Sequence, residues 1–145
     1  MLFEVNRNSY AIPLIHTVYV LTVDLDEIHQ ISNSMVLDVK SETLPLIYLK
    51  EFFENREYLS TGTKDQLPKR TQDIFIVSYN NKKAGLIVDK FLRQQDIVIK
   101  PLQQPVDDIE LFSGVTLLGT GEVCLVLDIP NITRNFLNKA SLIIA

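Results

Sequence analysis

The stretch that decides the fold is FSGVTLLGTGEVCLVLDI, residues 112–129. It contains two apolar, β-branched runs, 115–118 and 123–129, separated by Gly119-Thr120-Gly121 and Glu122. Glycine reaches the positive φ angles of a tight turn without steric cost, and a tight turn between twisted strands needs such angles. The pattern therefore predicts a β-hairpin.

The second strand of this hairpin is apolar on both faces. Its side chains alternate between one face with Val123, Leu125, Leu127 and Ile129 and another with Cys124 and Val126. A strand of this kind is covered on both sides, as in a small closed barrel or between two packed subdomains. The hairpin thus predicts an all-β protein with more than one apolar layer.

The rest of the chain repeats short apolar runs separated by polar turns. Further strands are expected at 2–5, 9–14, 18–23, 35–37, 44–49, 74–79, 84–88 and 97–99. The turns between them are expected at Asn6-Arg7-Asn8, Lys40-Ser41-Glu42 and Asn80 to Lys83, because Asn tolerates left-handed backbone. Pro13 has no N–H, so its strand must lie at an edge or end there.

Helical structure is expected to be sparse. Leu49, Phe52 and Phe53 are spaced three and four apart, which predicts one or two helical turns. Residues 24–31 are predicted to form a loop with about one helical turn. After Pro130, either Asn131 or Thr133 is expected to cap a short helix. The apolar side of that helix would comprise Ile132, Phe136 and Leu137.

Two polar segments interrupt the pattern. Residues 54–73 have almost no periodicity and are interpreted as a connecting loop, with a docking loop as the alternative. Residues 103–113 are acidic and irregular, and Asp107, Asp108 and Glu110 are interpreted as a solvated loop rather than an acid–base pair.

Composition excludes several classes of function. The 145 residues are 46% hydrophobic and 22% charged, with a net charge of −4, which suits a globular domain and not a nucleic-acid-binding one. No apolar run approaches the roughly 18 to 20 residues of a membrane span. One cysteine excludes an internal disulfide and fits a reducing cytoplasm. We therefore expect a cytoplasmic protein.

No catalytic, cofactor or metal site is predicted. His16 and His29 are isolated, and a lone histidine is far more often a surface or satisfied residue than a ligand or a base. Cys124 lies within an apolar strand, where an inert thiol is expected. Gly119-Thr120-Gly121 lacks the helix and the Lys-Ser/Thr of a phosphate-binding loop, so a hairpin turn is favoured over a nucleotide site.

The order of the motifs resembles a known family. NSYAIPL and ETLPLIYL are followed in order by KKAGLIVD and GEVCLVLDI, a weak internal repeat that indicates two similar barrels. Together with GLIVDKFLRQQDIVIKPL (85–102), these motifs resemble the CheW-like regulatory domain of chemotaxis histidine kinases, which is closely related to the CheW coupling protein. The resemblance covers roughly residues 1 to 135.

The resemblance implies an all-β fold of two packed five-stranded SH3-like barrels with an apolar core between them. The expected division is a single CheW-like domain over 1–145, with a first barrel at 9–60 and a second at 74–130. The N-terminal strand could join the second barrel, and residues 131–145 would form a C-terminal helix and tail. The apolar tail 141–145 could pack as a last strand or extend freely.

The resemblance also implies partners: a CheW-type coupling protein docked barrel to barrel, and the helical cytoplasmic tip of a chemoreceptor in a groove between the barrels. The implied partner-binding residues are Thr17, Val18, Lys40, Phe91, Leu92 and Gln94. The alternative for Val18, Phe91 and Leu92 is a place in the barrel core, and the alternative for Lys40 and Gln94 is a solvated surface position. Ser41 departs from the family pattern, which has glycine there, so the shape of that loop is expected to differ.

The domain is therefore expected to be non-catalytic, without ATP binding or phosphate transfer, and to associate with membrane receptor arrays only through its partners. A free-standing coupling protein, an unrelated β-barrel binding module and, more distantly, an enzyme are the alternatives.

Overall fold

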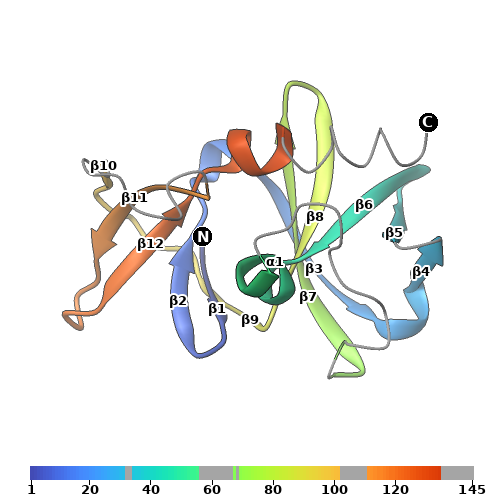
Figure 1. Cartoon of the computed structure of the whole chain (residues 1–145), viewed down its shortest axis with the longest axis horizontal. Helices are drawn as coiled ribbons and strands as arrows, with labels where there is room; N and C mark the ends of the chain where they lie inside the picture. The colour runs from blue at the N-terminus through green and yellow to red at the C-terminus, as the bar shows by residue number, and fades with distance from the viewer. Residues whose placement is uncertain (32–33, 56–66, 68, 102–110, 135–145) are drawn as a thin grey trace.

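The computed structural model describes residues 1–31, 34–55, 67, 69–101 and 111–134. It is an all-β protein built from two six-stranded sheets, one on each side of Figure 1. Sheet A has the order β10-β11-β12-β2-β1-β9 and sheet B the order β3-β7-β8-β6-β5-β4. Each sheet thus has six strands, where the resemblance implied five per barrel.

The strands of sheet A come from both ends of the chain. They are β1 (Leu2–Val5), β2 (Asn8–Ala11), β9 (Lys90–Arg93), β10 (Lys100–Pro101), β11 (Phe112–Leu117) and β12 (Val123–Leu127). The strands of sheet B are β3 (Thr17–Asp24), β4 (Ile28–Ile31), β5 (Ser34–Val39), β6 (Glu42–Tyr48), β7 (Thr71–Tyr79) and β8 (Lys82–Val88). Within each sheet one pair is parallel, β12 with β2 and β6 with β8.

The sheets divide the chain differently from the predicted halves 9–60 and 74–130. β7 and β8 lie in sheet B with β3 to β6, whereas β1 and β2 lie in sheet A with β9 to β12. The N-terminal strand does join the later strands, as the sequence allowed. β7 and β8 belong to sheet B because β8 pairs in parallel with β6. This pairing joins distant parts of the chain, so the internal sequence repeat could not predict it.

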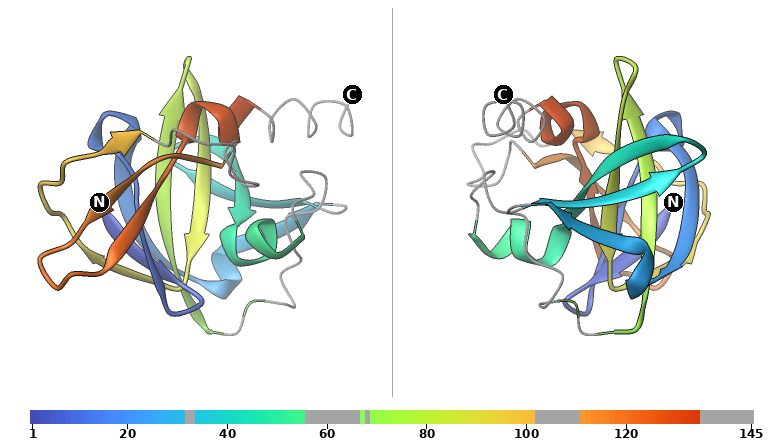
Figure 2. Two further views of the ribbon diagram at one scale, coloured as in Figure 1. Left: turned by 60° about the vertical axis from the view of Figure 1, so that its left-hand side comes forward. Right: turned by 90° about the vertical axis from the view of Figure 1, so that its right-hand side faces the viewer.

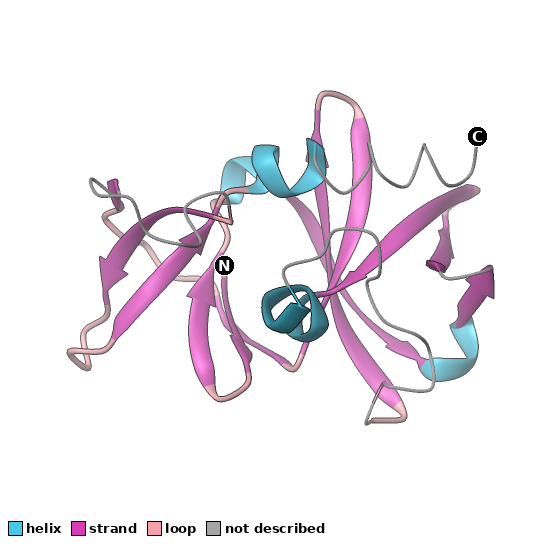
Figure 3. Cartoon of the chain, viewed as in Figure 1, coloured by secondary structure: helices cyan, strands magenta, loops and turns pink. Residues whose placement is uncertain are grey.

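Short helices lie mostly where the two sheets meet. Figure 3 shows η1 (Leu14–His16), α1 (Leu49–Asn55) and the helical residues 129–134 near this junction, and η2 (Leu25–Glu27) at the far side of sheet B. α1 confirms the helical spacing predicted at residues 49–53. The helix at 129–134 is capped by Asp128, whose carboxylate accepts the Asn131 N–H at 3.0 Å, so the predicted caps Asn131 and Thr133 are wrong. The helix begins before Pro130, because the first turn of a helix tolerates a residue without an N–H, and so its cap precedes the predicted one.

Three apolar clusters hold the fold together. The central core lies between the sheets and includes Phe3 and Leu127 from sheet A and Phe75 and Leu86 from sheet B. A second cluster, around Met35 and other residues, fills sheet B, and a third fills sheet A. The apolar core expected between the two barrels is therefore present. Each sheet also has an apolar cluster of its own.

The β11–β12 hairpin confirms the prediction made from its sequence. The turn is closed by hydrogen bonds from the Leu118 N–H to the Glu122 carbonyl (2.9 Å) and from the Gly121 N–H to the Leu118 carbonyl (2.8 Å), and Gly121 has a φ of 87°. Along β12, Cys124 and Val126 pack in the sheet A cluster, whereas Leu127 packs in the central core. The strand is covered on both faces over these residues.

Three further hairpins share one turn geometry. Asn6 and Arg7, Lys40 and Ser41, and Asn80 and Asn81 all have φ between 48° and 69°, as two-residue type I′ turns require. The three predicted turns are confirmed. Ser41 adopts the left-handed backbone in spite of its side chain, so the departure from glycine leaves the hairpin closed.

Several local predictions are wrong. Residues 24–31, predicted as a loop with about one helical turn, contain that turn as η2 but also the unpredicted strand β4. The strand predicted at 97–99 lies outside any ladder. The strand predicted at 9–14 ends at Ala11, two residues before Pro13. β9 was not predicted. β9 pairs with β1, a distant part of the chain that local periodicity does not report, whereas β4 pairs with the neighbouring β5.

Other predictions fall outside the described residues. They concern most of the connecting loop (56–66 and 68), the acidic residues Asp107, Asp108 and Glu110, and the C-terminal side chains Phe136 and Leu137 with the apolar tail 141–145.

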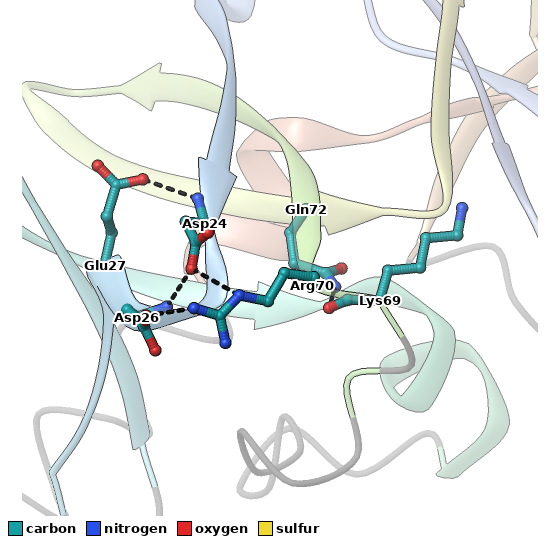
Figure 4. Close-up of polar contacts among 6 residues, drawn as sticks. All are labelled: Asp24, Asp26, Glu27, Lys69, Arg70 and Gln72. Carbon is teal, nitrogen blue, oxygen red and sulfur yellow. Dashed lines mark hydrogen bonds and ion pairs between the residues drawn. The ribbon is translucent and has the colours of Figure 1, made fainter.

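Polar contacts fix the start of β7 after the connecting loop. The Arg70 side chain pairs with the carboxylates of Asp24, at 3.3 Å, and Asp26 (Figure 4). The Arg70 carbonyl accepts the Leu25 N–H at 2.7 Å. Glu27 and Asp24 form a capping box at η2. Because both ion pairs are exposed, they contribute little free energy, but together they define where β7 begins.

Candidate protein-binding surfaces

Large apolar side chains are exposed at the outer end of sheet A. The sheet A end comprises Val98 (77% exposed), Ile99 (40%), Leu117 (70%) and Val123 (63%). Leu117 and Val123 are paired across the β11–β12 hairpin near its turn, which projects away from sheet B (Figures 1 and 2). Clustered exposed apolar side chains typically mark a site of protein interaction.

A groove runs between the extended residues 96–100 and the β11–β12 hairpin. Its volume is about 480 Å³, and its apolar lining includes Ile97, Val98, Val115 and Leu117. Asp96 and Lys100 also line it and bring opposite charges. The groove thus has mainly apolar walls with two charged side chains, Asp96 and Lys100, a combination that is typical of protein-binding surfaces.

Gly114 makes this groove possible. A Cβ atom on Gly114 would lie 2.5 Å from the Lys100 carbonyl oxygen and 2.8 Å from Ile99 Cγ2. Among the described residues, β10 pairs with β11 at two positions, Lys100 with Val115 and Pro101 with Gly114. The close backbone approach that glycine permits therefore holds one wall of the groove against β11.

A second exposed apolar surface lies at η1 and the start of β3. Leu14, Ile15 (86% exposed) and Val18 point toward solvent there. The register of β3 with β7 is irregular between Thr17 and Tyr19, so Val18 has no direct partner on β7. Such a bulge redirects a side chain, and here it leaves Val18 exposed beside η1.

The predicted residues Thr17, Val18 and Lys40 lie at this end of sheet B. The Thr17 hydroxyl donates to the Pro13 carbonyl at 3.1 Å. Lys40 lies in the β5–β6 turn, and its Nζ is 5.0 Å from the centre of the Tyr19 ring, a cation–π contact. The structure therefore brings these three residues to neighbouring positions on β3 and the turn beside it.

The predicted residues Phe91, Leu92 and Gln94 lie elsewhere, on or just after β9. Phe91 packs edge-on against Phe75, with ring centres 5.6 Å apart, and Leu92 packs against the sheet A cluster. Gln94 is exposed. Both apolar side chains are half-buried, which matches the alternative core role better than a fully exposed contact.

The six predicted residues do not form one surface. Thr17 pairs with Val77, whereas the β9 group lies beside Asp73, which pairs with Thr22. Five residues along a strand correspond to about 16 Å at roughly 3.3 Å per residue. The two groups therefore lie toward opposite ends of β3.

Sequence reasoning missed the most exposed apolar residues. Leu117 and Val123 were assigned to apolar strands, and Val98 to a strand of its own. Position beside the hairpin turn gives no signal of exposure, because Leu118 also adjoins the turn and is buried. Ile15 lies between the strands predicted at 9–14 and 18–23, where no exposed apolar surface was expected.

The reactive side chains have ordinary structural surroundings. Burial raises the pKa of the Cys124 thiol to about 11, and the charge of Glu122 adds to this, so the thiol is neutral near pH 7. His16 contacts Tyr79 edge-on, and His29 lies 3.9 Å from Asp38. Among the described residues, no three His, Cys, Asp or Glu side chains are grouped so that they could hold a metal ion. No helix within the described ranges is long and apolar enough to cross a membrane.

Comparison with known proteins identifies the family. The family model described as CheW-like domain matches residues 1–136, so this chain belongs to the CheW-like domain family of chemotaxis proteins. Chemotaxis protein CheA of Bacillus subtilis (strain 168) is 30% identical over 128 residues, covering 88% of this chain and 18% of the relative. CheA of Treponema pallidum (strain Nichols) is 29% identical over 129 residues, covering 89% and 15%.

The fold matches that of a solved scaffolding protein. TtCheW from Thermoanaerobacter tengcongensis superposes with a TM-score of 0.61 at 18% identity, covering 88% of this chain and 86% of that chain. At this identity the similarity concerns the fold alone. The chain spans only 15–18% of the length of the two CheA relatives.

Proposed function

We propose that this chain is the non-catalytic regulatory domain of a chemotaxis sensor kinase. It binds a CheW-type coupling protein and the cytoplasmic tips of chemoreceptors, and so couples the state of the receptor to kinase activity. It acts in the cytoplasm and reaches the membrane receptor array through these partners. The CheA relatives support this proposal, because they match over 88–89% of the chain.

The observation that carries the proposal is the sheet A end. Four large apolar side chains from two segments are exposed together beside a groove of about 480 Å³. An apolar surface at the end of a β-sheet suits docking against another barrel of similar shape, because both can bury apolar side chains without rearranging their ladders. The coupling protein would therefore dock at the sheet A end.

The receptor tip is assigned to the surface at η1 and the start of β3. This surface lies at the junction of the sheets (Figure 3), where the resemblance places a groove for a helical hairpin. Leu14, Ile15 and Val18 supply apolar contacts, and Thr17 and Lys40 lie beside them. Phe91, Leu92 and Gln94 remain proposed contacts at the other end of β3.

A free-standing CheW-type coupling protein is the second candidate. It is favoured because the fold of this chain covers 86% of the TtCheW scaffolding protein, at a TM-score of 0.61, so the matched fold makes up most of that chain. In that case the same surface would dock against the regulatory domain of a kinase. The reading frames on either side of this segment distinguish the two candidates.

Isothermal titration with a CheW-type coupling protein from the same organism tests the proposal. Wild-type domain is expected to bind saturably, and Leu117→Lys to weaken binding at least about 10-fold, because a charge replaces a central apolar contact. Ile31→Lys is the matched control, since Ile31 is 59% exposed on β4 at the far side of sheet B. ATP is expected to give no saturable heat.

Two results would contradict the proposal. One is the absence of saturable binding by wild-type domain at micromolar protein. The other is equal loss of affinity in Leu117→Lys and Ile31→Lys, which would show that the sheet A end has no special role.

A further inference from the structure

The two sheets are joined by an apolar core and by a small set of directed hydrogen bonds. Apolar contact in the central core is non-directional, so by itself it permits small rotations of one sheet against the other. Hydrogen bonds depend steeply on distance and angle, so they fix orientation. Hydrogen bonds that pass between the sheets are therefore able to fix the orientation of one sheet relative to the other.

Asp73 on β7 makes one such contact. Its Oδ1 accepts the Thr22 hydroxyl at 2.9 Å, a bond within sheet B, and its Oδ2 accepts the Phe91 N–H at 3.0 Å, a bond to sheet A. β9 is an edge strand of sheet A, paired on one side with β1. The carboxylate of Asp73 thus occupies the place of a further strand at the outer edge of β9.

Asp89 makes the neighbouring contacts, at the residue where the chain passes from β8 in sheet B to β9 in sheet A. Its N–H donates to the Glu4 carbonyl at 3.0 Å, and its Oδ2 accepts the Asn6 N–H at 2.8 Å. Its carbonyl accepts Lys69 Nζ at 3.0 Å. Asp89 therefore links the β1–β2 hairpin of sheet A to the segment that enters β7.

The two aspartates lie together and are held from the sheet B side. Val88, which pairs with Asp73, directly precedes Asp89. Lys69 directly precedes Arg70, which is fixed by Asp24 and Asp26 (Figure 4). We call this group of contacts the Asp73–Asp89 joint.

We propose that Asp73 is a positioning residue, which through this joint sets the orientation of sheet A relative to sheet B. The inference rests on the proposed function, because the two proposed partner surfaces lie apart, the sheet A end on one sheet and the β3 surface on the other. The orientation of the sheets determines the spacing and angle between a bound coupling protein and a bound receptor tip. Asp73 lies in neither of these two surfaces and acts through its hydrogen bond to β9.

Three variants separate this role from simple stabilisation. Asp73→Ala removes both hydrogen bonds. Asp73→Asn keeps an acceptor for the Phe91 N–H, and its amide can donate to the Thr22 hydroxyl oxygen, so it is the conservative rescue. Thr22→Val removes only the bond within sheet B and is the matched control.

Residual dipolar couplings of backbone amides, measured separately for each sheet, report the orientation directly. In the wild type, in Asp73→Asn and in Thr22→Val, both sheets are expected to share one alignment tensor. In Asp73→Ala, the tensor of sheet A is expected to rotate or shrink relative to that of sheet B. If Asp73→Ala does not fold, Asp73→Glu gives the same test, because one extra methylene displaces the carboxylate that holds β9.

One shared, unchanged tensor in the folded variant, whether Asp73→Ala or Asp73→Glu, would overturn the proposal. So would an equal change in Thr22→Val, which would indicate a general loss of order in β3 and β7. The measurement needs no partner protein, so it is independent of whether the domain binds a coupling protein. Failure of wild-type domain to bind would contradict the proposed function and leave the joint intact.

Discussion

The two sheets have equal numbers of strands but end differently. In sheet B, the β5–β6 and β7–β8 hairpins close at the polar turns Lys40-Ser41 and Asn80-Asn81. In sheet A, the β11–β12 hairpin carries exposed Leu117 and Val123 on either side of its turn, beside exposed Val98. Apolar side chains exposed at the end of a hairpin contribute little to folding, so we propose that the β11–β12 hairpin contacts a partner. The two sheet B hairpins lack such side chains at their turns, and the proposed partner surface of sheet B lies instead at η1 and the start of β3.

The largest expected effect compares two leucines of the same hairpin. Leu127 is fully buried in the central core, so Leu127→Ala is expected to lower the free energy of unfolding by about 2–5 kcal/mol. Leu117 is 70% exposed, so Leu117→Ala is expected to change it by less than about 0.5 kcal/mol. Urea unfolding monitored by circular dichroism measures both.

Leu125 refines this comparison. The sequence predicts the same large loss for Leu125→Ala as for Leu127→Ala, but Leu125 is only half-buried against the central core. Its loss is therefore expected to be intermediate. Equal losses of the free energy of unfolding in Leu117→Ala and Leu127→Ala would contradict the difference in burial between the two ends of the hairpin.

A smaller loss of stability is expected when either Gly114 or Gly85 is replaced by alanine, and the two variants are expected to differ in binding. A Cβ on Gly114 would meet the Lys100 backbone, whereas a Cβ on Gly85 in sheet B would meet side-chain atoms of Leu46, at 2.5 Å, and Ile74. Both alanine variants are expected to lose about 1–3 kcal/mol of stability through overpacking. Only Gly114→Ala is expected to weaken binding of the coupling protein, because it displaces one wall of the groove.

Isothermal titration of the two glycine variants, with unfolding curves measured in parallel, checks this expectation. Loss of affinity in Gly85→Ala of the same size as in Gly114→Ala would indicate that stability alone controls binding.

How far the sequence predicted this structure depends on the range of the contacts involved. The β11–β12 hairpin and the three polar turns follow from local chemistry, since Gly121, Asn80 and Asn81 are residues that tolerate positive φ. The exchange of β7 and β8 into sheet B could not be predicted, because parallel pairing of β8 with β6 depends on packing between distant segments.

The candidate site was less predictable than the fold. Val18 is part of an exposed apolar surface and Thr17 lies beside it. The sheet A end was hidden, because Leu117, Val123 and Val98 have the same local pattern as buried strand residues. Whether an apolar side chain is buried depends on how far its strand extends past the adjoining sheet. That length is a property of the assembled sheets.

The smallest expected effect concerns the turns of sheet B. Ser41 has a φ of 69°, a conformation that disfavours residues with a Cβ, so Ser41→Gly is expected to raise the free energy of unfolding by roughly 0.5–1 kcal/mol. Ser78→Gly, in the extended strand β7, is the control and is expected to lower it by a similar amount. Thermal unfolding measures both, and stabilisation by neither or by both would contradict the assignment of strain to Ser41.

The central claim is that the sheet A end is the docking surface for a coupling protein. Methyl NMR of domain labelled at Ile, Leu and Val, titrated with the CheW-type protein, tests it residue by residue. The account predicts shifts or broadening of the methyl signals of Val98, Ile99, Leu117 and Val123, with Ile31 unchanged. Saturating binding that leaves those four residues unperturbed would contradict it.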